Sequence, residues 1–224
     1  MTILFLIAVL AAVIVCVSWR IVLPPPKISI LGDSYSTFKK WIPEGNSTYY
    51  PCENPDLVTR VEECWWHIVL TALHGKLEKN ESWSGSTICH TGYGGNDFKT
   101  FSFVTRAGKL GDPTLIFICG GTNDSWAESP IGEFKWDNWS VDELYTFRPA
   151  MAKMLADIKS FYPQTQVFFI LNSGLKQIVN DSVHEICAHY NVKCVDLADI
   201  EKHENHPTVN GMKSIAAQVI KALE

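Results

Sequence analysis

The sequence predicts a single three-layer α/β/α domain, and three observations lead to this fold class. Short apolar runs that suit buried strands alternate with longer amphipathic segments that suit helices. This alternation favours a parallel sheet between two helical layers. The composition is ordinary for a globular protein, with 46% hydrophobic and 19% charged residues in a chain of 224. There is no internal repeat, and the chain beyond its N-terminal segment has the length of one domain with a full core.

Each expected element has a local signature. The apolar run at 115–119 is the clearest buried strand. Helices are expected where apolar residues recur with helical spacing, and they end at breakers such as Gly75 and Pro163. Residues 37–60 and 120–140 are expected to form long loops. In chain order the expected strands are 27–31, 77–82, 115–119, 166–171 and 193–195, and the expected helices are 62–73, 98–106, 147–162, 177–190 and 209–223.

The N-terminal segment has the composition of a targeting sequence. An unbroken apolar run at 3–17 precedes three prolines at 24–26. This length suits the core of a signal peptide, whereas a spanning helix needs about 20 apolar residues. We therefore expect residues 1–26 to be a signal peptide or membrane anchor with a proline-rich linker, the anchor being favoured, and residues 27–224 to be the folded domain. The domain would then be exported, either secreted or anchored in the cell envelope, and would touch a membrane only through this segment.

Net charge and cysteine spacing argue against two classes of function. A net charge of -5 without a basic stripe argues against a nucleic-acid partner. The seven cysteines include no C-x-x-C pair, so a zinc ribbon is not expected. Cys119 lies in an apolar strand and is expected to be a buried thiol. In an exported domain, Cys52, Cys187 and Cys194 could form disulfides, but the sequence does not fix their pairing.

No metal site is predicted. His184, Cys187 and His189 share an expected helix, but their spacing points His189 away from the other two. A solvated or packed helix face is the favoured interpretation. The glycine-rich run at 92–95 lacks the Gly-Lys-Ser/Thr ending of a phosphate-binding loop.

A candidate nucleophile follows the first strand. The stretch Ile-Ser-Ile-Leu-Gly-Asp-Ser-Tyr-Ser at 28–36 turns sharply at Gly32-Asp33-Ser34. Ser34 is therefore expected just past the carboxyl end of the strand, where open α/β sheets bind ligands. A serine with its hydroxyl in such a crevice can act as a nucleophile. The alternative is a polar turn capped by Asp33 or Ser34.

Further polar blocks lie at or beyond later strand ends. Gly85 belongs to Ser-Trp-Ser-Gly-Ser-Thr at 82–87, Asn123 to Gly-Gly-Thr-Asn-Asp at 120–124, and His206 precedes a proline. Right-handed crossovers place all strand carboxyl ends on one edge, so these residues should converge there. Acyl transfer needs a serine, a histidine base and N–H donors for the oxyanion. Taken singly, each block could instead be a turn or a helix entry.

Together, the four blocks resemble those of the SGNH (GDSL-type) hydrolase family, in the family's order and over residues 27–224. The resemblance implies a flavodoxin-like fold of about five parallel strands and an esterase or acylhydrolase activity without metal or other cofactor. It implies that Ser34 is the nucleophile and His206 the general base. The backbone N–H groups of Ser34 and Gly85 and the side chain of Asn123 would form the oxyanion hole.

One residue of the family pattern is missing. Family members usually carry an aspartate three residues before the histidine, where this sequence has His203. A neutral imidazole supplies no negative charge and is a poor replacement. Glu204 is expected to point away from His206, while Asp199 is far enough back for the loop to fold it against the ring. We expect a Ser34–His206 dyad whose imidazole is oriented by a backbone carbonyl or by Asp199, with His203 as the alternative.

The expected substrate is a small-molecule or carbohydrate ester with a short acyl group, such as O-acetyl. Both long loops follow strand carboxyl ends and should rim the crevice, where aromatic side chains suit a sugar ring. Trp41, Trp126 and Trp136 are the rim candidates, although these rings could equally pack the loops onto the domain. Three alternatives stay open: a lipid acylhydrolase, an acyltransferase at the same site, and an envelope binding protein that has lost turnover.

Overall fold

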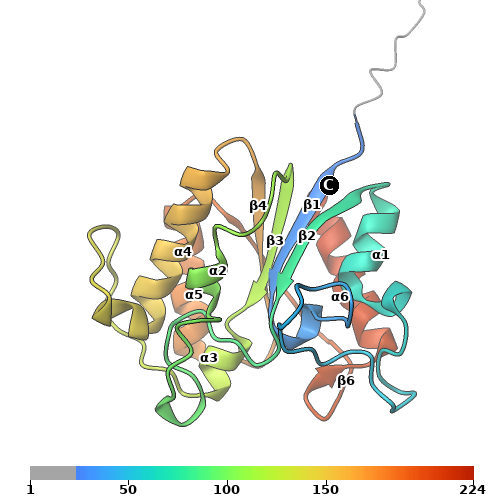
Figure 1. Ribbon diagram of the computed structural model, residues 1–224, viewed down its shortest axis with the longest axis horizontal. Helices are drawn as coiled ribbons and strands as arrows, with labels where there is room; N and C mark the ends of the chain where they lie inside the picture. The colour runs from blue at the N-terminus through green and yellow to red at the C-terminus, as the bar shows by residue number, and fades with distance from the viewer. Residues whose placement is uncertain (1–23) are drawn as a thin grey trace, which may run out of the picture.

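The computed structural model describes residues 24–224, in which five parallel strands lie between two layers of helices (Figure 1). The order β2-β1-β3-β4-β5 matches a flavodoxin-like sheet, so the predicted fold class is confirmed. The strands are β1 (Lys27–Gly32), β2 (Lys76–Ser82), β3 (Leu115–Gly120), β4 (Gln166–Leu171) and β5 (Lys193–Asp196).

The helices divide between the two faces of the sheet (Figure 1). One face is covered by α1 (Trp65–Ala72) and α6 (Val209–Leu223), which pack against each other. The other is covered by α2 (Phe103–Arg106), α4 (Phe147–Phe161) and α5 (Gln177–His189). The short α3 (Thr122–Trp126) follows β3 at the carboxyl edge.

The central strand β3 shows why its sequence is apolar throughout. Successive side chains of a strand point to opposite faces. Accordingly Ile116 and Ile118 pack into the layer of α4 and α5, whereas Phe117 and Cys119 pack into the layer of α1 and α6. All six residues of β3 are buried, as expected for a parallel strand covered on both faces. The expected burial of the Cys119 thiol is confirmed.

Three local features differ from the sequence-based expectation. The helix expected at 98–106 is reduced to α2, because Thr91 and Asp97 close a bridged turn and the chain does not become helical until Phe103. The loop expected at 120–140 begins with α3. Before α6, the chain forms a small hairpin from β6 (Lys202–His203) and β7 (His206–Pro207), too short to give a sequence pattern.

The predictions for the N-terminus and the cysteines have different outcomes. Residues 1–23 lie outside the described residues, so the predicted signal peptide or anchor at 1–26, and the export it implies, stay predictions. From residue 24 onward, no helix has the length and apolar character needed to cross a membrane. The six cysteines in this part of the chain are all free, so the disulfide considered for Cys52, Cys187 and Cys194 is not formed.

Candidate active site

Ser34 begins a single 3-10 turn, Ser34–Ser36, immediately beyond the carboxyl end of β1. Gly32 makes this turn possible, since a Cβ there would lie 2.6 Å from both Ser36 Cβ and Ser82 Oγ. Asp33 caps the turn, accepting a hydrogen bond of 3.0 Å from the backbone N–H of Tyr35. The capping interpretation and the placement of a serine at the sheet edge therefore both describe this turn.

His206 reaches Ser34 from the β6–β7 hairpin. Glu204 and Asn205 form its two-residue turn with φ values of 47° and 65°, the left-handed conformation of a type I′ turn. The Nε2 atom of His206 lies 3.0 Å from Ser34 Oγ, although the two residues are 172 positions apart in the sequence. The structure thus brings the predicted nucleophile and the predicted base within hydrogen-bond distance.

The other ring nitrogen of His206 contacts the main chain. Nδ1 lies 3.2 Å from the carbonyl oxygen of Glu204. A carbonyl can only accept, so Nδ1 carries the proton and Nε2 presents its lone pair to Ser34. Within residues 24–224, no side-chain hydrogen bond or ion pair joins Asp199 or His203 to His206, although His203 is the cross-strand neighbour of His206 in the hairpin. Burial lowers the pKa of His206 below its ordinary value, which favours the neutral base.

Three tyrosines hold the His206 hairpin. The ring of Tyr49 stacks on the imidazole with centroids 3.6 Å apart and an interplanar angle of 7°. The buried hydroxyl groups of Tyr35 and Tyr50 donate to the carbonyl oxygens of Asn205 and Pro207, on either side of His206. The loop at 37–60 therefore supports the histidine through Tyr49 and Tyr50, a role that its sequence did not indicate.

Two of the three predicted oxyanion donors, Gly85 and Asn123, lie on neighbouring segments. Gly85 has a φ of 79°, and its backbone N–H finds no acceptor among the described residues. The Asn123 amide donates from Nδ2 to the carbonyl oxygen of Ser86 at 3.0 Å, and its Oδ1 accepts from the Tyr93 hydroxyl at 2.7 Å. These two bonds fix the orientation of the amide, because a backbone carbonyl cannot donate. One N–H of Nδ2 remains for a ligand.

Asp124 anchors the segment that follows Gly85. Its carboxylate accepts from the backbone N–H of Ile88 at 2.8 and 3.0 Å and from that of Cys89 at 3.2 Å. Burial raises the pKa of Asp124 to about 6, and these N–H donors oppose the rise. Two adjacent residues therefore fix this segment: Asn123 bonds to it at Ser86, and Asp124 holds its backbone at Ile88 and Cys89.

Arg106 is a buried cation behind the site that the sequence analysis missed. It is 1% exposed and donates to the carbonyl oxygens of Phe101 at 2.8 Å and Gly32 at 3.2 Å, to Ser86 Oγ at 2.8 Å, and to the carbonyl oxygen of Glu81. One guanidinium thus joins the ends of β1 and β2 to the segment carrying Gly85. Burial lowers the pKa of Arg106 to about 10.

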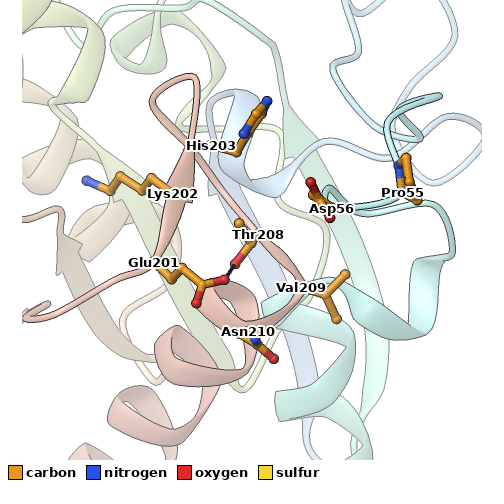
Figure 2. Close-up of a pocket in the computed structure, with 8 residues that line it drawn as sticks. All are labelled: Pro55, Asp56, Glu201, Lys202, His203, Thr208, Val209 and Asn210. Atoms are coloured by element: carbon orange, nitrogen blue, oxygen red, sulfur yellow. Dashed lines mark hydrogen bonds between the residues drawn. The ribbon is translucent and has the colours of Figure 1, made fainter.

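A groove of about 450 Å³ lies beside the His206 hairpin (Figure 2). Thr208 donates a hydrogen bond to Glu201 across its floor. His203 lines this groove, and it is also the cross-strand neighbour of His206 in the hairpin. The lining is mainly polar and charged, and consists of Pro55, Asp56, Glu201, Lys202, His203, Thr208, Val209 and Asn210.

The three rim tryptophans have different positions. Trp126 ends α3, three residues beyond Asn123, and is 37% exposed. Trp41 packs against Trp66 of α1, with ring centroids 5.8 Å apart, so it holds its loop on the domain. Trp136 stacks on His189 at the C-terminal end of α5, with centroids 4.0 Å apart. That end of α5 lies by the amino ends of the strands, whereas Ser34 lies at their carboxyl ends. The placement of Trp136 on the rim was therefore wrong.

Comparisons with known proteins agree with this architecture. The family model for GDSL-like Lipase/Acylhydrolase matches residues 26–223. A solved structure described as a GDSL-like lipase, from Bacteroides ovatus ATCC 8483, is 46% identical with a TM-score of 0.87, covering 89% of this chain and 98% of that one. Another so described, from Bacteroides uniformis ATCC 8492, is 45% identical with a TM-score of 0.88, covering 90% and 96%.

More distant structures share the fold. A family two carbohydrate esterase from Clostridium thermocellum, solved in complex with cellohexaose, is 17% identical with a TM-score of 0.58. The match covers 89% of this chain and 64% of that one. No curated protein matches this chain.

Proposed function

Because this chain belongs to the GDSL-like lipase/acylhydrolase family, we propose that it hydrolyses carboxylic esters with Ser34 as nucleophile and His206 as general base. The observation that carries the proposal is the 3.0 Å separation of Ser34 Oγ and His206 Nε2, with Nδ1 engaged by a backbone carbonyl. This arrangement delivers the correct tautomer without a carboxylate.

The reaction follows from the positions of these groups. His206 Nε2 takes the proton of Ser34 as Oγ attacks the ester carbonyl, and the imidazolium then protonates the departing alkoxide. The N–H groups of Ser34 and Gly85 and the free N–H of Asn123 stabilise the oxyanion. His206 then deprotonates a water molecule that attacks the acyl-enzyme, and as the acid leaves, the imidazolium returns the proton to Ser34 Oγ.

We further propose that the ester is a short acyl group on a carbohydrate. The groove beside the His206 hairpin is lined by carboxylates, a hydroxyl and an imidazole, groups that suit hydroxyl-rich ligands better than alkyl chains. Two exposed aromatic rings lie near Asn123: Tyr93 donates a hydrogen bond to it, and Trp126 follows it by three residues in α3. Both rings could stack on a sugar. The fold shared with the cellohexaose-bound esterase is consistent with this substrate class.

The test is a comparison of kcat/KM for acetylated sugars with that for octanoyl and longer esters, using the full chain. Ser34→Ala and His206→Ala serve as inactive references, and a fluorophosphonate probe should label wild type but not Ser34→Ala. We expect a preference for acetylated sugars. A preference for long chains would overturn the substrate proposal alone, while probe labelling and turnover unaffected by Ser34→Ala would overturn the mechanism. An added alcohol acceptor reports acyl transfer.

The oxyanion role of Asn123 needs its own variant. Asn123→Ala removes one donor and should lower kcat by roughly 10²–10³-fold. Tyr93→Phe keeps the amide but removes the hydroxyl that orients it, so it should lower kcat by a smaller factor. Full kcat in Asn123→Ala would remove this residue from the mechanism.

A further inference from the structure

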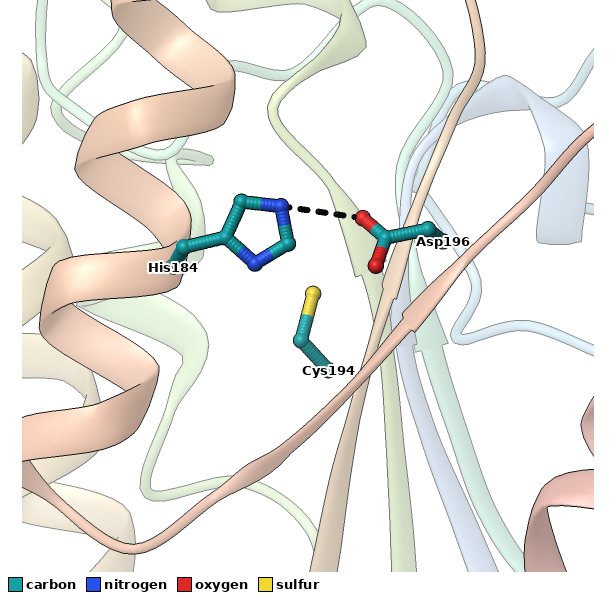
Figure 3. Close-up of side chains that lie close together, drawn as sticks. All are labelled: His184, Cys194 and Asp196. Atoms are coloured by element: carbon teal, nitrogen blue, oxygen red, sulfur yellow. Dashed lines mark ion pairs between the residues drawn. The ribbon is translucent and has the colours of Figure 1, made fainter.

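A second cluster of chemically reactive side chains lies at the β5 edge of the sheet. One ligand atom each from His184, Cys194 and Asp196 lies within 4.8 Å of the others, and Figure 3 shows the three side chains converging. His184 Nε2 and Asp196 Oδ1 are 3.1 Å apart. In the order β1-β3-β4-β5, strand β5 is three places from β1, or about 14 Å at the usual strand spacing. The cluster is therefore separate from Ser34.

The local structure explains why these residues meet. Cys194 and Asp196 alternate along β5, so their side chains leave the strand on the same side. Helix α5 packs against β5 and presents His184 to them (Figure 3). The sequence analysis considered His184, Cys187 and His189 of one helix as a metal site and rejected that set. The structure instead joins one histidine of that helix to two residues of the strand that follows it.

The donor set selects among cations. An imidazole nitrogen, a thiolate sulfur and a carboxylate oxygen are the ligands of zinc, whereas Mg²⁺ and Ca²⁺ prefer oxygen alone. Zinc ligands at about 2.0–2.3 Å from the ion lie about 3.3–3.8 Å from one another in a tetrahedral site. The observed separations need only small side-chain movements to reach these values. An exposed His–Asp ion pair would account for two of the three residues, but not for the thiol between them.

We propose that His184, Cys194 and Asp196 form a zinc site that fastens α5 to β5, with water in the fourth position. The side chains of His184 and Asp196 are 48% and 61% exposed, which leaves a path for the ion and its water. Because the cluster is remote from Ser34, bound zinc stabilises this edge of the fold and takes no part in ester hydrolysis.

Cys187 defines the competing chemistry at the same place. It is buried one helical turn beyond His184, and its pKa is raised above the usual range, first by the neighbouring Cys194 thiol and then by burial. A small-molecule disulfide could oxidise these thiols by exchange, in which a Cys187–Cys194 disulfide forms, the S–S bond of the oxidant breaks, and its two halves leave as thiols carrying the two protons. That bond would remove the thiolate from the cluster, so zinc binding requires reduced cysteines.

Cobalt binding provides the test, because thiolate-to-Co²⁺ charge transfer reports sulfur ligation directly. The full chain is kept in a non-thiol reductant, its free thiols are counted, and it is titrated with Co²⁺ and then with Zn²⁺. We expect one ion per chain, a charge-transfer band displaced by zinc, and a higher Tm with zinc. Cys194→Ser should lose the band, and Asp196→Asn should bind at least about tenfold more weakly.

Matched controls and a catalytic reference make the test decisive. Cys52→Ser and His74→Ala remove similar groups outside the cluster and should bind as wild type does. Ser34→Ala should show the same rise in Tm with zinc, which separates this site from the proposed function. Absence of the band in fully reduced wild type would overturn the proposal, as would equal binding by wild type and Cys194→Ser.

Discussion

The ring of Tyr49 lies flat on the imidazole of His206, with ring centroids 3.6 Å apart and planes 7° from parallel. An aromatic face attracts a cation, so in the proposed mechanism the stack would stabilise the imidazolium formed when His206 takes the proton of Ser34. Family members assign this electrostatic task to the aspartate that is replaced here by His203. We therefore infer that Tyr49 compensates in part for a missing negative charge, while the Glu204 carbonyl accepts from Nδ1 and so fixes the tautomer.

Replacing the aromatic face should change catalysis through His206. Tyr49→Phe keeps the stack and should retain near-normal kcat. Tyr49→Leu fills space without a π-face and should lower kcat by up to about tenfold, and it should also lower the pKa seen in the pH profile. Steady-state rates over a pH series measure both effects. A Leu variant with the profile and kcat of wild type would show that the stack only packs the loop.

Side chains near the histidine should be dispensable. Asp199→Asn, His203→Ala and Glu204→Gln all leave the main-chain acceptor of Nδ1 in place, so each should stay within about threefold of wild-type kcat. Loss of a true triad aspartate costs about 10⁴-fold. His206→Ala is the reference for full loss. A fall of that size in any of the three variants would identify that side chain as the group that orients His206, and would contradict this prediction.

Activity should fall at acidic pH along a single limb. His206 accepts a proton only when neutral, and burial lowers its pKa below the ordinary value of about 6.5. The limb in kcat/KM should therefore lie below pH 6.5. His203→Ala should leave its position unchanged. A limb at or above the ordinary histidine value would contradict the assignment.

The contribution of Asp33 to the stability of the fold should fall as pH rises, whereas activity should rise with pH. Burial raises the pKa of Asp33 to about 7, although Arg106 and the N–H of Tyr35 lower it, and its Oδ2 has no partner among the described residues. Because the pKa of Asp33 in the folded protein is above the unfolded value of about 3.9, its contribution to the unfolding free energy is fully present below about pH 4 and is lost as the pH rises through about 7. Asp33→Asn does not titrate, so between pH 5 and 7 its unfolding free energy should gain on wild type by roughly 1.4 kcal/mol per pH unit. Urea unfolding measures this, and parallel pH trends in the two proteins would contradict it.

Removing the guanidinium of Arg106 should destabilise the whole domain. Arg106→Met keeps much of the apolar stem but removes a donor from buried acceptors on three segments, of which the Gly32 carbonyl keeps the N–H of Trp83, at a cost of about 3–5 kcal/mol in unfolding free energy. Arg60→Met is the control, since that arginine pairs with Glu63 at the surface, where solvent screens the pair, and its loss should change the unfolding free energy far less. Denaturant unfolding gives both values. Equal effects in the two variants would show that the buried contacts contribute little.

The sequence was informative wherever topology fixes position. Parallel strands joined by crossovers place their carboxyl ends together, so Ser34, Gly85 and Asn123 could be placed on one edge from local motifs alone. The five strands were also predicted within a residue at most ends, because strands buried on both faces have distinctive apolar runs. The resemblance to the SGNH family was confirmed by the family match over residues 26–223. The sequence blocks that carry the resemblance lie at or beyond the ends of strands.

The features that were missed depend on contacts between distant segments. The stack of Tyr49 on His206 and the bonds of Arg106 join parts of the chain that no local pattern relates. Trp136 was misplaced because a strand fixes where its loop begins but not where the loop runs. The β6–β7 hairpin has only two residues per strand, fewer than any periodicity needs.

The hairpin that carries His206 also sets the moment at which the site can exist. During synthesis, Ser34 leaves the ribosome 172 residues before His206 does. Helix α6, which completes the layer with α1, is made later still. A nascent chain thus holds the proposed nucleophile without the proposed base until its last segment docks. Ester turnover by ribosome-bound chains of increasing length would therefore report the chain length at which the site is completely folded.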